Sequence, residues 1–66
     1  MVSEMQDRLL RIAQVESATG LKKSAIYKLA SEGRFPKALK ITARASAWPE
    51  SLVQSWIRER IAGRAA

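Results

Sequence analysis

The sequence predicts a small, mainly helical fold with three helices and one β-hairpin, and three observations support this class. Apolar residues recur with helical spacing on both sides of Gly20, over residues 12–19 and 23–32. Residues 37–48 instead alternate between apolar and polar side chains, as the strands of a hairpin do. A third helical stripe of apolar residues follows Pro49. The 66 residues suffice for one domain with a small core.

The N-terminal part is expected to form one short strand before the first helix. Residues 1–7 are polar and are predicted to be a flexible terminus. Leu9 and Leu10 form a brief apolar run, which favours a short edge strand. The first helix then begins near Ile12 and ends at Gly20, because the residue after a helix must tolerate a positive φ.

The second predicted helix, residues 23–32, is amphipathic. Its apolar side consists of Ala25, Ile26, Leu29 and Ala30. Its polar side consists of Lys23, Ser24, Tyr27, Lys28 and Ser31. Gly33 ends this helix, and the Pro at position 36 imposes an extended exit on the residue before it.

The hairpin is predicted to have its tip at residues 43–44. Leu39 and Ile41 share one face of its first strand, and Lys40 and Thr42 share the other.

The last helix begins at Pro49, where a missing N–H costs nothing. Its apolar stripe, which is expected to be used fully by the core, consists of Leu52, Val53, Trp56, Ile57 and Ile61. The domain is predicted to span residues 8–62, with residues 63–66 as a flexible tail. Trp48 and Trp56, the two largest apolar side chains, are assigned structural roles.

Positive charge is concentrated in one third of the chain. The net charge is +6, from 12 basic and six acidic side chains. Residues 22–44 contain seven basic side chains and one acidic side chain, so this segment carries the whole net charge. A charge confined in this way favours a polyanionic partner over a role in solubility alone.

The composition argues against most catalytic and metal chemistry. The chain has no histidine and no cysteine, so it lacks imidazole, thiolate and the usual zinc ligands. We therefore predict that the protein is not an enzyme and that it binds no cofactor and no metal. No apolar run approaches the ~20 residues that span a bilayer, and no signal peptide is recognisable. We expect a cytoplasmic, nucleoid-associated protein without a membrane partner.

Two short helices joined by a tight turn that contains Gly20 describe a helix-turn-helix, whose second helix enters the major groove of DNA. The N-terminus of such a helix offers free N–H groups and a partial positive charge to phosphate. The predicted DNA-binding residues of this helix are Lys22, Lys23, Ser24, Tyr27 and Lys28.

The hairpin is interpreted as a wing beside that helix, which makes the predicted fold a winged helix-turn-helix. Arg44 lies at its tip, and a flat guanidinium suits a phosphate or a narrow minor groove. Arg34, Lys37 and Lys40 are expected to contribute long-range attraction and not specific contacts.

From Arg8 to Ile61 the chain resembles the AlpA family of small prophage regulators, relatives of excisionases with a winged helix-turn-helix of the MerR type. Four segments carry the resemblance in order: "RLLRIAQV", "TGLKKSAIYKLASEGRFPKALK", "RASAWPES" and "VQSWIRERIAGR". The resemblance implies DNA binding that controls integrase or excisionase genes, or that bends attachment-site DNA. By position, it places the recognition helix on Lys23, Ser24, Tyr27 and Lys28 and the wing on Arg44.

The chain departs from the family pattern at two points. Family members often have Ser or Thr as the N-cap where this chain has Lys22. The loss of such a cap costs roughly 1 kcal/mol, and a lysine there suggests that phosphate takes over part of the role. The wing of many members contains glycine, whereas residues 41–45 of this chain contain none.

The function predicted on these grounds is that of a sequence-specific, DNA-binding transcriptional regulator of prophage type. The alternative with the same fold is an excisionase-like recombination directionality factor that bends attachment-site DNA. A further alternative is a protein-interaction adaptor. The predicted partner is double-stranded DNA; self-association on DNA, and contact with integrase or another phage protein, accompany these alternatives.

Overall fold

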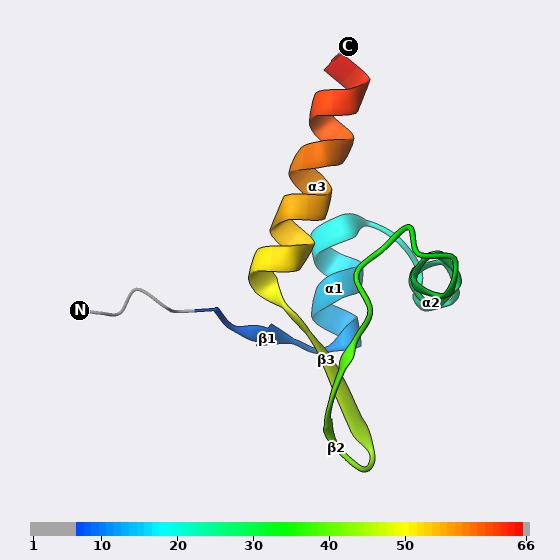
Figure 1. Ribbon diagram of the computed structural model, residues 1–66, viewed down its shortest axis with the longest axis vertical. Coiled ribbons are helices and arrows are strands. Elements are labelled where there is room, and N and C mark those ends of the chain that lie inside the picture. The colour runs from blue at the N-terminus through cyan, green and yellow to red at the C-terminus, as the bar shows by residue number, and fades with distance from the viewer. Residues whose placement is uncertain (1–6, 66) are drawn as a thin grey trace, which may run out of the picture.

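Three helices and a three-stranded antiparallel sheet make up residues 7–65, the part of the chain that this computed structural model describes (Figure 1). The elements in chain order are β1 (Leu9–Leu10), α1 (Ile12–Thr19), α2 (Lys23–Ser31), β2 (Leu39–Thr42), β3 (Ala45–Pro49) and α3 (Glu50–Ala65). The prediction of a mainly helical fold with a β-hairpin wing is confirmed. Most of the N-terminal segment predicted to be flexible, residues 1–6, lies outside the described residues.

The sheet has the order β1-β3-β2, so the first strand joins the hairpin along its second strand. β1 pairs with β3 through Leu9 opposite Pro49 and Leu10 opposite Trp48. The backbone N–H of Glu50 donates to the carbonyl of Arg8 at 2.7 Å and extends this ladder by one bond. The predicted edge strand is therefore present, and it fixes the start of the fold to the junction between β3 and α3.

Glycines end the first two helices. Gly20 follows α1 with φ 78°, and Gly33 follows α2 with φ 76°. After α2 the N–H of Arg34 donates to the carbonyl of Leu29 at 2.8 Å, which closes the final turn. An L-residue with a side chain pays roughly 1–2 kcal/mol in this left-handed region, so glycine is the residue that lets each helix stop where it does.

The core lies where α1, α2 and α3 meet one face of the sheet. Trp48 is fully buried at its centre, and its indole N–H donates to the carbonyl of Pro36 at 2.8 Å. Trp56 is half-buried and donates in the same way to Arg34 at 2.7 Å. Both tryptophans thus hold the segment between α2 and β2 against the domain. The buried cluster consists of Leu10, Val15, Ile26, Ala30, Phe35, Trp48 and Val53.

The expectation for the stripe of α3 is only partly correct. Val53 is fully buried, but Leu52 and Ile61 are 48% and 62% exposed. Ile61 belongs to the later part of α3, which extends well beyond the sheet and the other helices (Figure 1), whereas Leu52 is exposed in the first turn, beside the buried Val53. The helix also continues through Gly63 to Ala65, where the sequence suggested an end near Ala62. Gly63 has no positive φ, so it does not interrupt the helix.

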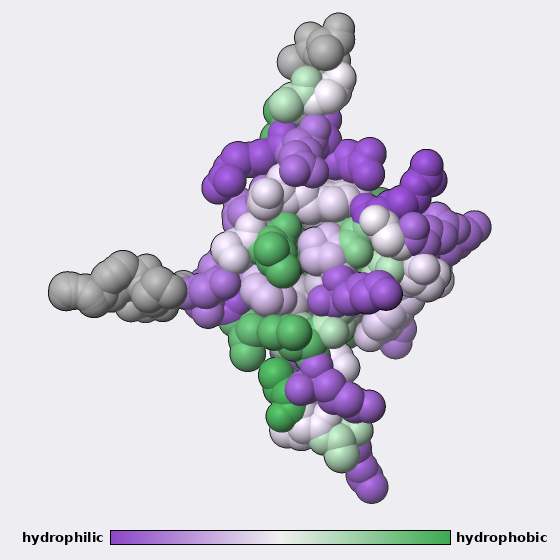
Figure 2. Space-filling model, viewed as in Figure 1, coloured by the Kyte–Doolittle hydropathy of each residue, from purple (hydrophilic) through white to green (hydrophobic). Residues whose placement is uncertain are grey.

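The sheet also has a second, exposed apolar face. Side chains alternate along β3, so Ala47 and Pro49 lie on the face opposite to Trp48. Their partners across the strands, Leu39 and Leu9, are 51% and 48% exposed, while Ala47 itself is fully buried. Apolar surface accordingly gathers over the strands in Figure 2.

The N-terminus of α3 is capped by a residue that is distant in sequence. The backbone N–H of Ser51 donates to Asp7 Oδ1 at 2.9 Å, and the Ser51 hydroxyl donates to Asp7 Oδ2 at 2.7 Å. The backbone bond above all, and then the hydroxyl bond, lower the pKa of Asp7 below its ordinary value of 3.8. The carboxylate occupies the place that an N-cap side chain normally fills.

Removing this cap in Asp7→Ala is expected to lower the melting temperature at pH 7 by a few degrees. Because the folded-state pKa is lowered, the stabilisation is present above the unfolded-state pKa and is lost as the pH falls through the folded-state pKa. The difference from the parent chain should therefore shrink in acid, as measured by circular dichroism melts between pH 7 and pH 2. Glu59→Ala, which removes a carboxylate later in α3, is the control and should show no such trend. A gap that persists at low pH would contradict the electrostatic account.

Candidate nucleic-acid interface

The exposed start of α2 is the first part of the candidate site. Lys22 is its N-cap residue, with φ −85° and ψ 160°, and its side chain makes no hydrogen bond to the helix. A lysine has no acceptor with which to cap N–H groups. The first-turn N–H groups therefore receive no acceptor from the N-cap side chain, and they point toward the end at which Lys22, Lys23 and Ser24 are all exposed.

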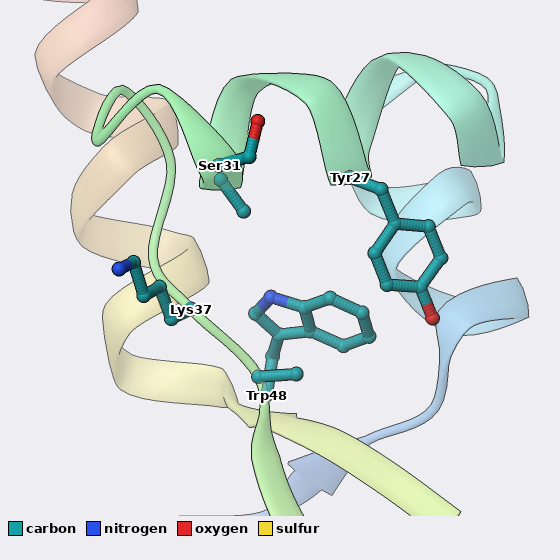
Figure 3. A pocket seen from close by; sticks show the side chains of 6 residues that line it. Tyr27, Ser31, Lys37 and Trp48 are labelled. Atoms are coloured by element: carbon teal, nitrogen blue, oxygen red, sulfur yellow. The ribbon is translucent and has the colours of Figure 1, made fainter.

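Tyr27 and Lys28 continue this exposed side by one helical turn. Tyr27 is 47% exposed, and its ring is tilted by 53° against that of Trp48, with 5.8 Å between the centroids. The ring thus packs on the edge of the core while the hydroxyl points away from α2 (Figure 3). Lys28 is exposed and lies in the last turn of α2, where a cation is favoured by the helix dipole.

Almost none of the positive charge in the basic segment, residues 22–44, is neutralised by the fold. Within the described residues the one ion pair joins Arg34 to Glu32, with 3.9 Å between Nη1 and Oε1, and both side chains are exposed. No described carboxylate lies within 4.0 Å of the other cations of the segment, namely Lys22, Lys23, Lys28, Lys37, Lys40 and Arg44. These ammonium and guanidinium groups are therefore available to an external anion.

The hairpin tip turns without glycine. The register shifts between Lys40 and Thr42, which marks a bulge, and the Arg44 N–H donates to Thr42 Oγ1 at 3.2 Å. No non-glycine residue among those described has a positive φ. The bulge and the threonine hydroxyl together shape a turn at positions 43–44 that contains no glycine. Arg44 is exposed at the end of a hairpin that projects beyond the helices (Figure 1).

The structure therefore brings five of the predicted residues together and places the sixth apart. Lys22, Lys23, Ser24, Tyr27 and Lys28 share the start and the exposed side of α2. Arg44 lies at the far end of the β2–β3 hairpin, which is linked to α2 by the contact of Tyr27 with Trp48. The arrangement offers cations, hydroxyl groups and open backbone N–H groups to an anionic surface.

Sequence reasoning missed a hollow between α2 and the hairpin. It has a volume of about 230 Å³ and is lined by Tyr27, Ala30, Ser31, Lys37, Ala38 and Trp48 (Figure 3). Lys37 had been assigned only a long-range role. The alternation of residues 37–48 indicated a strand but did not show that its approach faces α2, so the sequence held no local signal for the hollow.

None of the helices in the described part of the chain combines the length and the apolar character needed to cross a lipid bilayer. Residues 8–61 match the family model described as "Prophage CP4-57 regulatory protein (AlpA)". A relative from Enterobacteria phage P4, described as "Uncharacterized protein ORF88", is 41% identical over 59 residues, which cover 89% of this chain and 67% of the relative. No solved structure matches the chain.

Proposed function

Since the chain belongs to the AlpA family of prophage regulatory proteins, we propose that it is a sequence-specific, DNA-binding transcriptional regulator. One observation carries the proposal: among the residues that the structure describes, the exposed side of α2 presents cations without acidic partners, and no side chain caps its N-terminus. An anion at that end would accept hydrogen bonds from the open N–H groups of the first turn. The phosphate backbone of DNA supplies such anions at regular spacing.

In the proposed complex, α2 lies in the major groove. A helix with its side chains is about 10–12 Å across, and the groove is about 12 Å wide. Lys22 and the first-turn N–H groups bind phosphate, which fixes the register of the helix on the duplex. In this proposal Lys23 and Ser24 read base edges, and Tyr27 and Lys28 reach a base or the flanking backbone.

The β2–β3 hairpin acts as the wing in this proposal. Its tip carries Arg44, whose planar guanidinium suits a phosphate or the negative potential of a narrow minor groove. The bulge before Thr42 increases the local twist and directs the tip. Contacts from the wing would add affinity beside the groove that α2 occupies.

Titration of a duplex selected from random sequences, compared with a scrambled duplex over a salt series, tests the proposal. We expect a clear preference for the selected duplex. We also expect log K to fall by about 0.9 per phosphate contact for each unit of log salt, for roughly four to six contacts. A binding constant that does not depend on the salt concentration, or that is the same for both duplexes, would contradict the proposal.

The excision-factor alternative is favoured by one specific observation, the exposed apolar face formed by Leu9, Leu39 and Pro49 with Ala47 beneath them. This face points away from α2, so it would stay open to a neighbouring copy on adjacent DNA. The same titration on a duplex with two adjacent sites separates the functions. Strong cooperativity on closely spaced repeats supports a DNA-bending assembly, and independent binding supports a regulator that acts on single sites.

A further inference from the structure

The hollow between α2 and the hairpin is too small for a typical effector molecule. Its volume of about 230 Å³ is below the roughly 300–1,000 Å³ of most small-molecule pockets. Trp48 lies at its bottom and is fully buried, so no ring face is open for a base to stack on. The hollow therefore suits a small, non-planar group that enters from the surface.

Its walls combine apolar and cationic chemistry. Ala30 and Ala38 provide apolar sides, and Lys37 lines the side opposite Tyr27 with its ammonium directed outward, away from Trp48 (Figure 3). The Ser31 hydroxyl is already engaged, because it donates to the carbonyl of Lys28 at 2.8 Å. The donors that remain for an incoming group are Lys37 and the Tyr27 hydroxyl, one on each side of the hollow.

The proposed binding mode brings one part of DNA to this place. A helix in the major groove and a wing on the adjoining minor groove lie on either side of the strand that separates the two grooves. That strand must cross between α2 and the β2–β3 hairpin, where the hollow opens. Its repeating unit is a deoxyribose, with an apolar C–H surface, next to an anionic phosphate.

We propose that the hollow is a binding site for one sugar–phosphate unit of duplex DNA. The deoxyribose packs against Ala30 and Ala38, and the Lys37 ammonium binds the adjacent phosphate, with the Tyr27 hydroxyl on the other side. This inference rests on the proposed DNA-binding function and deepens it. It makes Lys37 a direct contact that fixes the register between helix and wing, instead of a source of general attraction.

The first test compares Lys37→Gln with Arg58→Gln on the selected duplex. Both variants remove one exposed positive charge, and Arg58 lies on α3 outside the basic segment. We expect Lys37→Gln to weaken binding roughly tenfold and to reduce the slope of log K against log salt by about 0.9, as the loss of one phosphate contact requires. Arg58→Gln should change the affinity by no more than about twofold. Equal effects of the two variants would overturn the inference.

The second test locates the phosphate. Neutral methylphosphonate linkages are introduced one at a time along the selected duplex, and each duplex is titrated with the parent protein and with Lys37→Gln. One linkage should weaken the parent protein and have little further effect on Lys37→Gln. Additive losses at every linkage would overturn the direct contact.

A third variant, Ala38→Leu, fills the hollow without changing the charge. It should weaken binding to the selected duplex while circular dichroism remains that of the parent protein. Unchanged binding by this folded variant would overturn the proposal that a deoxyribose packs in the hollow. Absence of salt-dependent binding by the parent protein would instead contradict the proposed function itself.

Discussion

Replacement of both Lys23 and Lys28 by glutamate is expected to abolish detectable binding to the selected duplex, a loss of more than about 100-fold. Both ammonium groups are exposed on α2, and neither has an acidic partner within the described residues. Each substitution removes attraction to phosphate and adds a repulsive carboxylate at the same place. The net charge falls from +6 to +2, because two changes of two units are made. Titration at moderate salt, near 0.1 M, where the Debye length is about 10 Å, is the measurement.

A control with the same net charge separates position from total charge. Arg11→Glu combined with Arg58→Glu makes the same reduction at exposed sites outside the basic segment. This variant should retain most of the preference for the selected duplex and lose affinity mainly through the general field. Lys28 is in the last turn of α2, where a glutamate costs about 0.3–1 kcal/mol, so both variants are checked by thermal melts. Equal loss of binding in the two folded variants would contradict a specific role for α2.

The helical elements were predictable because their signals are local. Apolar residues have helical spacing within each helix, Ile12 and Val15 in α1 and Ile26 and Leu29 in α2, and each of these two helices is followed by a glycine. Both signals depend only on neighbours within one or two turns. α2 consequently lies within one residue of its predicted end. The hairpin tip was also located correctly from alternation alone, although its bulge was not.

Features that depend on long-range packing were not predictable. The cap of α3 joins Asp7 to Ser51 across 44 positions, and no local pattern announces such a bond. The exposure of Ile61 depends on how far α3 extends beyond a small sheet, which the apolar stripe does not encode. A stripe shows which side of a helix is apolar, but the size of the facing surface decides how much of it is buried.

The candidate site likewise has one part that local sequence signals predict and one part that depends on long-range packing. The exposed side of α2 follows from helical geometry once the apolar side is known, so the exposure of Lys23, Tyr27 and Lys28 was predictable by elimination. The hollow at Lys37 required the packing of two elements that are separated in sequence by a proline-directed exit. An extended segment can run in several directions after a helix, and the indole bond from Trp48 to Pro36 selects the one observed.

The largest effect on stability is expected from Trp48→Ala. Trp48 is fully buried, contacts Tyr27 and donates to Pro36, so its removal leaves a cavity and an unpaired carbonyl. Such truncations cost about 3–5 kcal/mol. A core of this size rarely supplies more than about 3–5 kcal/mol in total, so the variant should be largely unfolded at 25 °C. Urea titration followed by far-ultraviolet circular dichroism measures the loss.

Two matched variants serve as controls for Trp48→Ala. Trp48→Phe keeps most of the ring volume and loses the bond to Pro36, so it should remain folded with a smaller loss. Trp56→Ala removes a half-buried ring and should also cost less than Trp48→Ala. A fully folded Trp48→Ala would show that the core does not depend on this residue.

Trp48→Ala also distinguishes the contribution of the fold to DNA binding from that of the charge, because it leaves the net charge of +6 unchanged. An unfolded chain of that charge still attracts the phosphate backbone, so weak, salt-dependent binding to any duplex should persist. The preference for the selected duplex should disappear, because it requires α2 and the wing to be held in one arrangement. Retained preference in an unfolded variant would mean that the basic segment reads DNA without the fold, and loss of preference alone would mean that Trp48 maintains the geometry on which recognition depends.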